Sequence, residues 1–434
     1  MARRAAAAHP AKARSEELIR AVKGTRDLLP PATALWNRVE EAARRVFHAY
    51  HYREIRTPVL EPTELFARGV GQETDIVRKE MYTFEDRDGS SLTLRPEATA
   101  PVIRAYLEHR LDQQPGIQKL FYIGPMFRRE RPQKGRYRQF HQIGAEAIGS
   151  SSPAVDAEII ELLVEVLSRA GLEGFSLVLN SVGCPRCRPS YLERLRAELR
   201  GKAASLCADC RRRAETNPLR VLDCKVPEDQ PAIASLPSLL DHLCSECREH
   251  FAAVRRMLAQ RAIAYELAPR LVRGLDYYMR TTFEVVHGAL GAQNSVAGGG
   301  RYDGLAEALG AKIAAPGIGF SIGEDRLVLA LEEAGHAPSS CAPDLFIAAV
   351  GEAALEHAAS LARRLRATGA AVELSFEPRL KRSLEIANRL GVGRVLIVGE
   401  EEIASGSYTL RDMQTGEQRS LCEEALWRLL AGGN

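Results

Sequence analysis

The sequence predicts a globular protein with a large α+β part followed by a compact α/β module. Its 434 residues correspond to two or three domains at about 150 residues per domain. Hydrophobic residues make up 45% and charged residues 26% of the chain. These are ordinary values for a folded protein, and they exclude disorder, collagen and coiled coil as the main architecture. Hydrophobic patterns of helix and strand type then assign each part to its class.

The charge balance and the lack of long apolar runs exclude two further classes. Lys and Arg number 59 against 56 Asp and Glu, a formal net charge of +3. This balance excludes a uniformly basic polyanion binder but leaves room for a local basic patch. No run of 18 apolar residues occurs, so we expect no membrane span.

Residues 1–22 are predicted to form a flexible basic extension. Residues 1–14 carry four basic residues and no acidic one. A transit peptide is the alternative, but no Ser precedes Ser15. Because the segment also lacks the apolar core of a signal peptide, we expect a reduced, cytoplasmic setting. Structured sequence begins near Lys23.

The first structured part alternates helices with extended segments. Apolar residues at helical spacing predict a helix over 32–49. Residues 55–66 contain Pro58 and Pro62, which predict an extended segment and not a helix. A helix over 98–110 follows.

A hairpin and two later strands supply the β structure. Residues 120–130 and 136–149 have strand-like patterns on either side of a polar loop, which predicts an antiparallel pair. A helix over 153–170 follows. Strand character returns at 281–288, and 317–335 has the pattern of a strand that runs into a helix.

Residues 183–258 are predicted to form an inserted subdomain rich in Arg and cysteine. Six of the nine cysteines of the chain form three CxxC pairs: Cys184/Cys187, Cys207/Cys210 and Cys244/Cys247. The first two pairs are 19 residues apart, inside the window for a four-thiolate zinc site, and the third pair could replace either. The alternative is reduced cysteines packed as small hydrophobic residues.

A boundary rich in Pro and Ser falls at 336–344, and a regular alternation follows it. The predicted strands are 345–350, 370–376 and 394–400, and the predicted helices are 353–367 and 380–390. Strands that alternate with helices indicate an α/β module of roughly 90 residues with mostly parallel pairing.

The basic segment 127–138 is the first candidate for a binding site. No GxxxxGK[ST] motif occurs, and GGGRY lacks the GxGxxG register, so a bound phosphate would have to meet side-chain cations. The segment holds six Lys or Arg and one Glu, with Pro132 and Gly135 marking it as a loop. Arginine matches phosphate oxygens well. The alternative is a solvated charged hairpin.

Three shorter segments are weaker candidates. In 94–101, Glu97 suits an ammonium partner, and the alternative is capping of the following helix. The RGLDYY segment, 273–278, suits a small polar ligand, and the alternative is an ordinary strand start with a salt bridge. In 317–326, Arg326 near a helix N-terminus favours a bound anion, and the alternative is tight strand–helix packing with a solvent-facing Arg.

Taken together, these segments resemble the histidyl-tRNA synthetase family of class II aminoacyl-tRNA synthetases over residues 23–434. The matching segments are KGTRDLLP (23–30), TPVLEPTELFARGVG (57–71), LTLRPEATAP (92–101), FRRERPQKGRYRQFHQIGAE (127–146), LVRGLDYYMRTTFEV (271–285), GGGRYDGL (298–305) and GFSIGEDRL (319–327). Two mild departures are Asp325, where Glu is more usual, and VAGGG in place of a Cys-Ala-Gly-Gly run.

The resemblance implies a fold and a domain order. It implies a catalytic domain over 23–338 with the class II antiparallel sheet flanked by helices, interrupted by the insertion at 183–258. An anticodon-binding domain over 343–434 follows. It also implies a homodimer. Zinc is not a general requirement of the family, so no metal site is assigned to the cysteines.

The resemblance also implies roles for residues of this chain. Arg128 matches the residue that holds the ATP α-phosphate and the amino-acid carboxylate, Glu130 the acid near the adenine amino group, and Arg326 the residue on the γ-phosphate. Arg273 matches an Arg peculiar to the family that assists at the α-phosphate. The implied histidine-binding set is Glu97, Ala98, Thr99, Arg128, Gln142, Glu146, Arg273, Tyr277 and Tyr278.

The implied reaction joins L-histidine to ATP, with Mg²⁺ on the pyrophosphate, and then transfers histidine to tRNA(His) with release of AMP. Three arginines suit this chemistry because two anions must approach each other. Arg131, Gln133 and Lys134 are expected to contact the tRNA acceptor end. Two alternatives are the histidine-sensing regulatory subunit of ATP phosphoribosyltransferase, disfavoured by Arg273 and the C-terminal module, and a class II synthetase for another amino acid.

Overall fold

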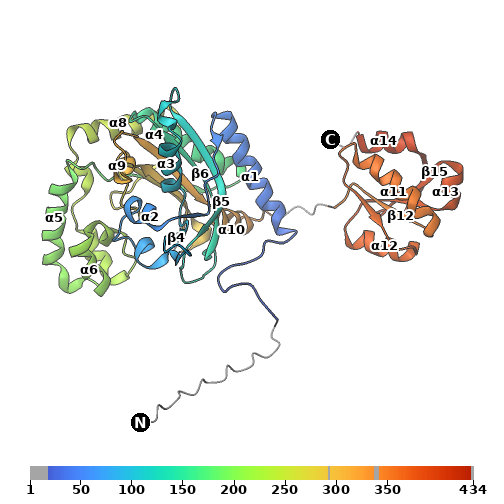
Figure 1. Cartoon of the computed structure of the whole chain (residues 1–434), viewed down its shortest axis with the longest axis horizontal. Helices are drawn as coiled ribbons and strands as arrows, with labels where there is room; N and C mark the ends of the chain where they lie inside the picture. Colours follow the sequence, from blue (N-terminus) through green and yellow to red (C-terminus); the bar gives the residue numbers. More distant parts are fainter. Residues whose placement is uncertain (1–17, 292–293, 337–341, 432–434) are drawn as a thin grey trace, which may run out of the picture. The chain divides into compact units, whose positions relative to one another are not determined.

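The computed structural model describes residues 18–291, 294–336 and 342–431. Most of the expected N-terminal extension, 1–22, therefore lies outside the described residues. The chain divides into two compact units, Met1–Ala337 and Pro338–Asn434, and each is treated by itself (Figure 1). Within the described ranges, no helix has the length and apolarity needed to cross a membrane.

An eight-stranded sheet forms the centre of the large unit. Its order is β1 (Arg53–Glu54), β5 (Gln118–Phe127), β6 (Gln139–Ile148), β11 (Gly317–Gly323), β10 (Ser295–Arg301), β9 (Met279–His287), β7 (Phe175–Ser181) and β8 (Glu266–Leu267). The pairing is antiparallel except for the parallel edge pairs β1–β5 and β7–β8. This confirms the predicted antiparallel class and adds a mixed character at both edges.

The β5–β6 hairpin runs from the Gln118–Ile148 pair to the Phe127–Gln139 pair. Strand β5 ends at Phe127, three residues earlier than predicted, because the basic segment leaves the sheet there. The glycine-rich β10 was not predicted as a strand, since three successive glycines lack β propensity.

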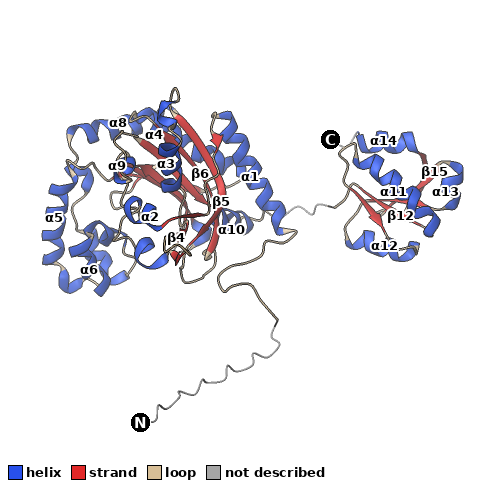
Figure 2. Cartoon of the chain, viewed as in Figure 1, coloured by secondary structure: helices blue, strands red, loops and turns tan. Residues whose placement is uncertain are grey.

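Helices cover both faces of the sheet (Figure 2). On one face, α1 (Ala32–Ala49), α4 (Pro153–Ala170), α8 (Ser245–Gln260) and α10 (Glu324–Glu333) share a hydrophobic core with β6 and β11. On the other face, α3 (Thr99–Glu108) and α9 (Leu305–Ala308) pack on β5. The boundaries of α1 and α4 are those predicted from helical spacing. Helix α4 begins with Ser152 as its cap, whose hydroxyl accepts the Ala154 N–H at 3.3 Å.

The prediction of a wholly extended 55–66 segment is wrong. Strand β2 (Leu60–Pro62) forms a small sheet with β4 (Ser91–Leu94) and β3 (Tyr82–Glu85). Helix α2 (Thr63–Gly69) begins directly after Pro62. Proline is compatible with a helix start, where its missing N–H has no intrahelical partner, and Phe66 is buried by the helical turn. A π-helix, Ile76–Glu80, follows.

The cysteine-rich segment between β7 and β8 is helical and has its own core. Its α-helices are α5 (Arg188–Gly201), α6 (Ala208–Thr216) and α7 (Gln230–Ala234), before α8 returns the chain to the sheet. Tyr191, Leu195 and Leu199 give α5 a buried stripe at helical spacing. The same core includes most of the cysteines and Tyr278.

The C-terminal unit is a five-stranded sheet covered by helices on both faces. The strand order is β13 (Val372–Ser375), β12 (Leu345–Ala349), β14 (Arg394–Val398), β15 (Ser407–Asp412) and β16 (Gln418–Cys422). The helices are α11 (Glu352–Arg366), α12 (Leu380–Arg389), α13 (Glu400–Ser405) and α14 (Glu423–Ala431). The three predicted strands are parallel, while β15 and β16 add an antiparallel extension that the sequence did not predict.

A buried ion-pair network ties three parts of the large unit together. Asp156 on α4 accepts hydrogen bonds from Arg301 on β10, with Nε to Oδ1 at 3.0 Å, and contacts His250 on α8 at 2.8 Å. Asp156 and Arg301 are both 0% exposed. Arg301 also donates to Asp303 at 2.7 Å. Because a buried charge is costly without its partner, this network couples the cysteine-rich segment to the sheet.

We predict that Asp156→Asn lowers the thermal midpoint of the large unit by about 5 °C, since breaking a buried pair costs roughly 3 kcal/mol. Calorimetry of the full chain measures this shift. The matched control is Glu165→Gln on the same helix, which breaks an exposed pair with Arg169 and should cost less than about 0.5 kcal/mol. Equal shifts in the two variants would contradict a structural role for the network.

Candidate active site

A cavity of ≈ 170 Å³ opens over β5, β6, β10 and β11 of the large unit. Nine residues predicted from the sequence line it together: Glu97, Thr99, Arg128, Glu130, Gln142, Arg273, Tyr277, Tyr278 and Arg326. Segments up to about two hundred residues apart in the chain thus meet at one place. Two other predicted residues, Ala98 and Glu146, are buried behind this lining.

Arg128 leaves the end of β5 in a held orientation. Its Nε donates to the Pro96 carbonyl at 2.9 Å, and its guanidinium lies over the Phe140 ring at 5.2 Å. Glu130 faces Arg128 at 3.8 Å and pairs with Arg136 at 3.1 Å. The alternative of a solvated hairpin therefore does not describe Arg128, whereas Arg131, Gln133 and Lys134 of the same loop are exposed.

Arg326 lies in the first turn of α10, close to a second cation. Burial, and then the charge of Arg136, lower the pKa of Arg326 to about 10. The side chain stays positively charged at neutral pH, because Glu284 and Glu130 oppose this lowering of its pKa. A bound anion would also favour the charged form. The carboxylate of the neighbouring Asp325 accepts hydrogen bonds from Arg26 at 2.7 Å and from the His141 N–H at 2.9 Å.

Arg273 reaches the cavity across the glycine-rich strand β10. Its guanidinium pairs with Glu284 on β9. A Cβ added to Gly298 would lie 2.5 Å from the guanidinium carbon of Arg273. A methyl group at this position would therefore displace the guanidinium. Of the glycine run, Gly298 is the residue that allows the close approach of Arg273.

Glu97 both caps a helix and lines the cavity. Its carboxylate accepts the Thr99 N–H at 2.8 Å and the Ala100 N–H at 3.0 Å, at the start of α3. The Tyr277 hydroxyl donates to the same carboxylate at 3.4 Å. Burial raises the pKa of Glu97, and the two backbone bonds and Arg128 oppose this shift. The capping interpretation is thus confirmed, and the same carboxylate lies in the lining of the cavity.

Gln142 and two tyrosines complete the polar end of the cavity. The Gln142 side-chain oxygen is buried and has no hydrogen-bond partner. The rings of Tyr277 and Tyr278 lie 4.7 Å apart beside it. A buried acceptor without a donor favours a ligand that supplies an N–H group.

Glu146 lies one layer deeper, on β6. Its carboxylate accepts the Thr99 hydroxyl at 2.8 Å and the Tyr302 hydroxyl at 2.6 Å. Complete burial raises its pKa to about 8, and these two hydrogen bonds oppose the shift. Gly319 on β11 leaves the space that this carboxylate occupies. Glu146 therefore fixes the orientation of Thr99 in the lining.

The sequence did not single out several residues of the cavity. Arg136 lines it from the basic loop, and Tyr122, Phe140 and Ser321 line it from β5, β6 and β11. Tyr302 supports Glu146 from behind. The signal for Arg136 was present in the density of positive charge, but the single tyrosines have no sequence pattern that separates them from core residues.

The cysteines of the helical insertion form two groups, and these are not the first grouping considered from the spacing, in which the first two CxxC pairs share a site. The third pair replaces the second, which was the stated alternative. Cys184 and Cys187 lie with the third CxxC pair, and not with the second. Cys207 and Cys210 lie instead with Cys224, which belongs to no CxxC pair, and with an aspartate.

A mostly antiparallel sheet flanked by helices, with a cavity lined by three arginines and buried polar groups, fits the catalytic domain of a class II aminoacyl-tRNA synthetase. Residues 24–327 match the family model described as histidyl-tRNA synthetase, and residues 344–431 match that of an anticodon binding domain. The chain belongs to the histidyl-tRNA synthetase family.

Relatives of nearly equal length support this assignment. The chain is 68% identical to a histidine–tRNA ligase of Solibacter usitatus (strain Ellin6076), over 96% of this chain and 100% of the relative. It is 56% identical to that of Koribacter versatilis (strain Ellin345), over 94% and 95%. The apo histidyl-tRNA synthetase structure from S. aureus matches with a TM-score of 0.80 at 35% identity, over 95% of this chain and 100% of that one.

We predict a pH-dependent stability difference for Glu146→Gln. The raised pKa means that the folded protein keeps a proton on Glu146 up to about pH 8, while the unfolded chain releases it near 4.5. The free energy of unfolding therefore falls as pH rises through this window. Glutamine cannot ionise, so the variant should gain stability relative to the parent between pH 5 and pH 8. Parallel pH profiles in thermal unfolding would contradict a protonated Glu146.

Proposed function

We propose that this chain is a histidine–tRNA ligase, which activates L-histidine with ATP and transfers it to tRNA(His). The observation that carries the proposal is one cavity lined by Arg128, Arg273 and Arg326 together with buried polar groups. The relatives named histidine–tRNA ligase across nearly the whole length support it.

The first step would be attack of the histidine carboxylate on the α-phosphate of ATP. A new carboxylate–phosphate bond forms while the bond to pyrophosphate breaks. Both reactants are anions, so the three guanidiniums would lower the barrier by neutralising charge that develops between them. No protein base is needed because the carboxylate is already ionised at neutral pH.

We assign the roles of the arginines from the family resemblance. Arg128 lines the cavity from the end of β5 and suits the α-phosphate and the carboxylate. Arg326 lies at the start of α10 and suits the γ-phosphate, while Arg273 would assist at the α-phosphate. Glu130, held by Arg136, suits the adenine amino group.

The polar end would bind histidine itself. Glu97, Thr99 and the unpaired Gln142 oxygen suit the ammonium group, with the Ala98 backbone beside them. Tyr277 and Tyr278 would contact the imidazole, as the family resemblance implies. Glu146 would act on the imidazole through the Thr99 and Tyr302 hydroxyls, or directly if these hydroxyls turn away from its carboxylate. Two hydrogen-bonding groups suit imidazole because one of its nitrogens donates and the other accepts. Another amino acid would leave these buried groups without hydrogen bonds, which would disfavour its binding.

Mg²⁺ would enter with ATP. Glu130 and Glu284 offer the oxygen ligands that Mg²⁺ prefers, but both are paired with arginines. The phosphate oxygens of ATP would therefore supply most of the ligands of the ion, and the arginines would share in neutralising the phosphate charge.

We also propose that the chain works in the cytoplasm and that it forms a homodimer, the latter as the family resemblance implies.

The C-terminal unit would bind the anticodon of tRNA(His). Its match to an anticodon binding domain supports this role, and unpaired bases are the usual target of sequence-specific RNA recognition. The alternative of a regulatory subunit of ATP phosphoribosyltransferase is less favoured, because Arg273 lines the cavity and the anticodon-binding module is present.

Histidine-dependent exchange between ATP and pyrophosphate tests the proposed activation step. We expect exchange with the purified chain, and a loss of about 100-fold or more in Arg273→Ala, since one charge-stabilising donor is worth 10²–10³ in rate. Histidine should still bind to this variant. The control is Arg169→Ala, which removes an exposed guanidinium from α4. No exchange by the folded parent chain would overturn the proposed function, and near-normal exchange in Arg273→Ala would overturn the role of Arg273.

Charge reversal in the exposed basic loop should separate the two half-reactions. Arg131→Glu and Lys134→Glu remove positive charge that suits the phosphates of the tRNA acceptor end. We expect a larger loss in aminoacylation than in pyrophosphate exchange, measured at the same enzyme concentration. Arg169→Glu is the matched surface control. Equal losses in both assays would argue against a tRNA contact.

A further inference from the structure

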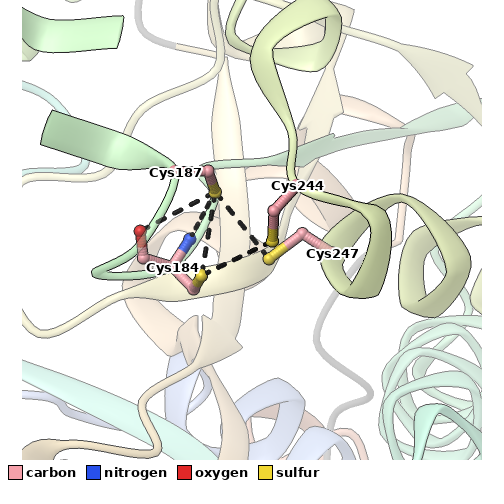
Figure 3. Close-up of side chains that lie close together, drawn as sticks. All are labelled: Cys184, Cys187, Cys244 and Cys247. Atoms are coloured by element: carbon pink, nitrogen blue, oxygen red, sulfur yellow. Dashed lines mark hydrogen bonds between the residues drawn. The ribbon is translucent and has the colours of Figure 1, made fainter. Parts of the chain in front are cut away.

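The helical insertion gathers four cysteines from its two ends. Cys184 and Cys187 lie in the loop between β7 and α5, and Cys244 and Cys247 lie at the start of α8, 60 residues later. Figure 3 shows the four sulfur atoms pointing toward one another. All four lie within 4.8 Å of one another, and each is a free thiol. The arrangement therefore joins the start of the insertion to its end.

The distances between these sulfurs are those of a tetrahedral metal site. Cys184 and Cys187 are 3.7 Å apart, Cys184 and Cys244 are 3.8 Å apart, and Cys187 and Cys247 are 3.9 Å apart. Four sulfurs at about 2.3 Å from a zinc ion lie about 3.8 Å from one another in a regular tetrahedron. Because thiols in van der Waals contact reach similar pairwise distances, the stronger evidence for a metal is the convergence of four sulfurs, all within 4.8 Å of one another.

The surroundings also suit thiolates. Three of the four cysteines are buried, and Cys244 is half-buried. The Cys184 N–H donates to the Cys187 sulfur at 3.2 Å, and backbone donors of this kind stabilise the negative charge of a metal-bound thiolate. Two CxxC pairs of this type form the usual closed ligand set of a structural zinc site.

We propose that Cys184, Cys187, Cys244 and Cys247 bind a structural zinc ion that clamps the two ends of the insertion. The clamp is next to the active site. Arg188, one residue beyond Cys187, donates to the Tyr278 carbonyl at 2.6 Å. Gly183 and Val182 also form backbone bonds with Arg280 at 2.7 and 2.8 Å. Zinc would thus hold the segment that carries Tyr277 and Tyr278.

A separate set of residues carries a second zinc site in the same segment. Cys207, Cys210, Cys224 and Asp229 offer ligand atoms within 4.8 Å of one another. Asp229 is 1% exposed, and its carboxylate accepts the Cys207 N–H at 2.8 Å and the Cys224 thiol at 3.2 Å. Neither contact is positively charged, and a buried carboxylate among three sulfurs favours a cation. Zinc accepts three thiolates and one carboxylate oxygen.

Metal analysis of the full chain, purified without a histidine tag or chelator, tests both sites. We expect two zinc ions per chain by mass spectrometry. The double variant Cys184→Ser with Cys247→Ser should lose one ion, and Cys207→Ser with Cys224→Ser should lose the other. The control is Cys422→Ser, an exposed cysteine of the C-terminal unit, which should retain both ions.

Cobalt substitution keeps the test decisive if a variant fails to fold. After removal of metal from the parent chain, added Co²⁺ should give the visible absorption of tetrahedral thiolate coordination, and Zn²⁺ should displace it. A parent chain with no bound metal and no cobalt spectrum would overturn both sites. Bound iron with its own visible absorption would overturn the assignment to zinc. If the parent chain binds one zinc ion and not two, the site whose double variant loses that ion is supported, and the other site is overturned.

Discussion

The active site depends on the close approach of large side chains to strands that carry none. Arg273 lies directly over Gly298 on β10, and the Glu146 carboxylate occupies the space next to Gly319 on β11. A methyl group at either position would meet these side chains at a distance that real atoms do not reach. At these two positions the sheet presents bare backbone, a glycine floor against which Arg273 and Glu146 lie.

Two further arginines reach the same cavity as Arg273. Arg128 extends from the end of β5 and Arg326 from the first turn of α10. Burial, and then the charge of Arg136, disfavour the charged form of Arg326 and lower its pKa. A polyanionic substrate such as ATP would favour the charged form.

Local patterns predicted much of this arrangement, and long-range packing explains the remainder. Helices α1 and α4, the β5–β6 hairpin and the strand–helix alternation after residue 344 follow from hydrophobic period alone. Strand β10 escaped prediction because its glycines lack β propensity, while Gly298 makes room for Arg273 and Gly299 for the backbone of β11. The partners of Cys184 and the buried position of Glu146 depend on contacts between distant segments, which spacing cannot supply. The roles of Arg128, Arg273 and Arg326 came from the family resemblance.

The most direct test of the glycine floor is the pyrophosphate exchange rate of Gly298→Ala. Its control is Gly288→Ala, since a Cβ at Gly288 meets no atom within 4 Å. We expect Gly298→Ala to fold but to lose exchange by about 100-fold, as for loss of one charge-stabilising group, because Arg273 must move. Gly288→Ala should keep the parent rate. Equal rates in the two variants would contradict the claim that the bare strand positions Arg273.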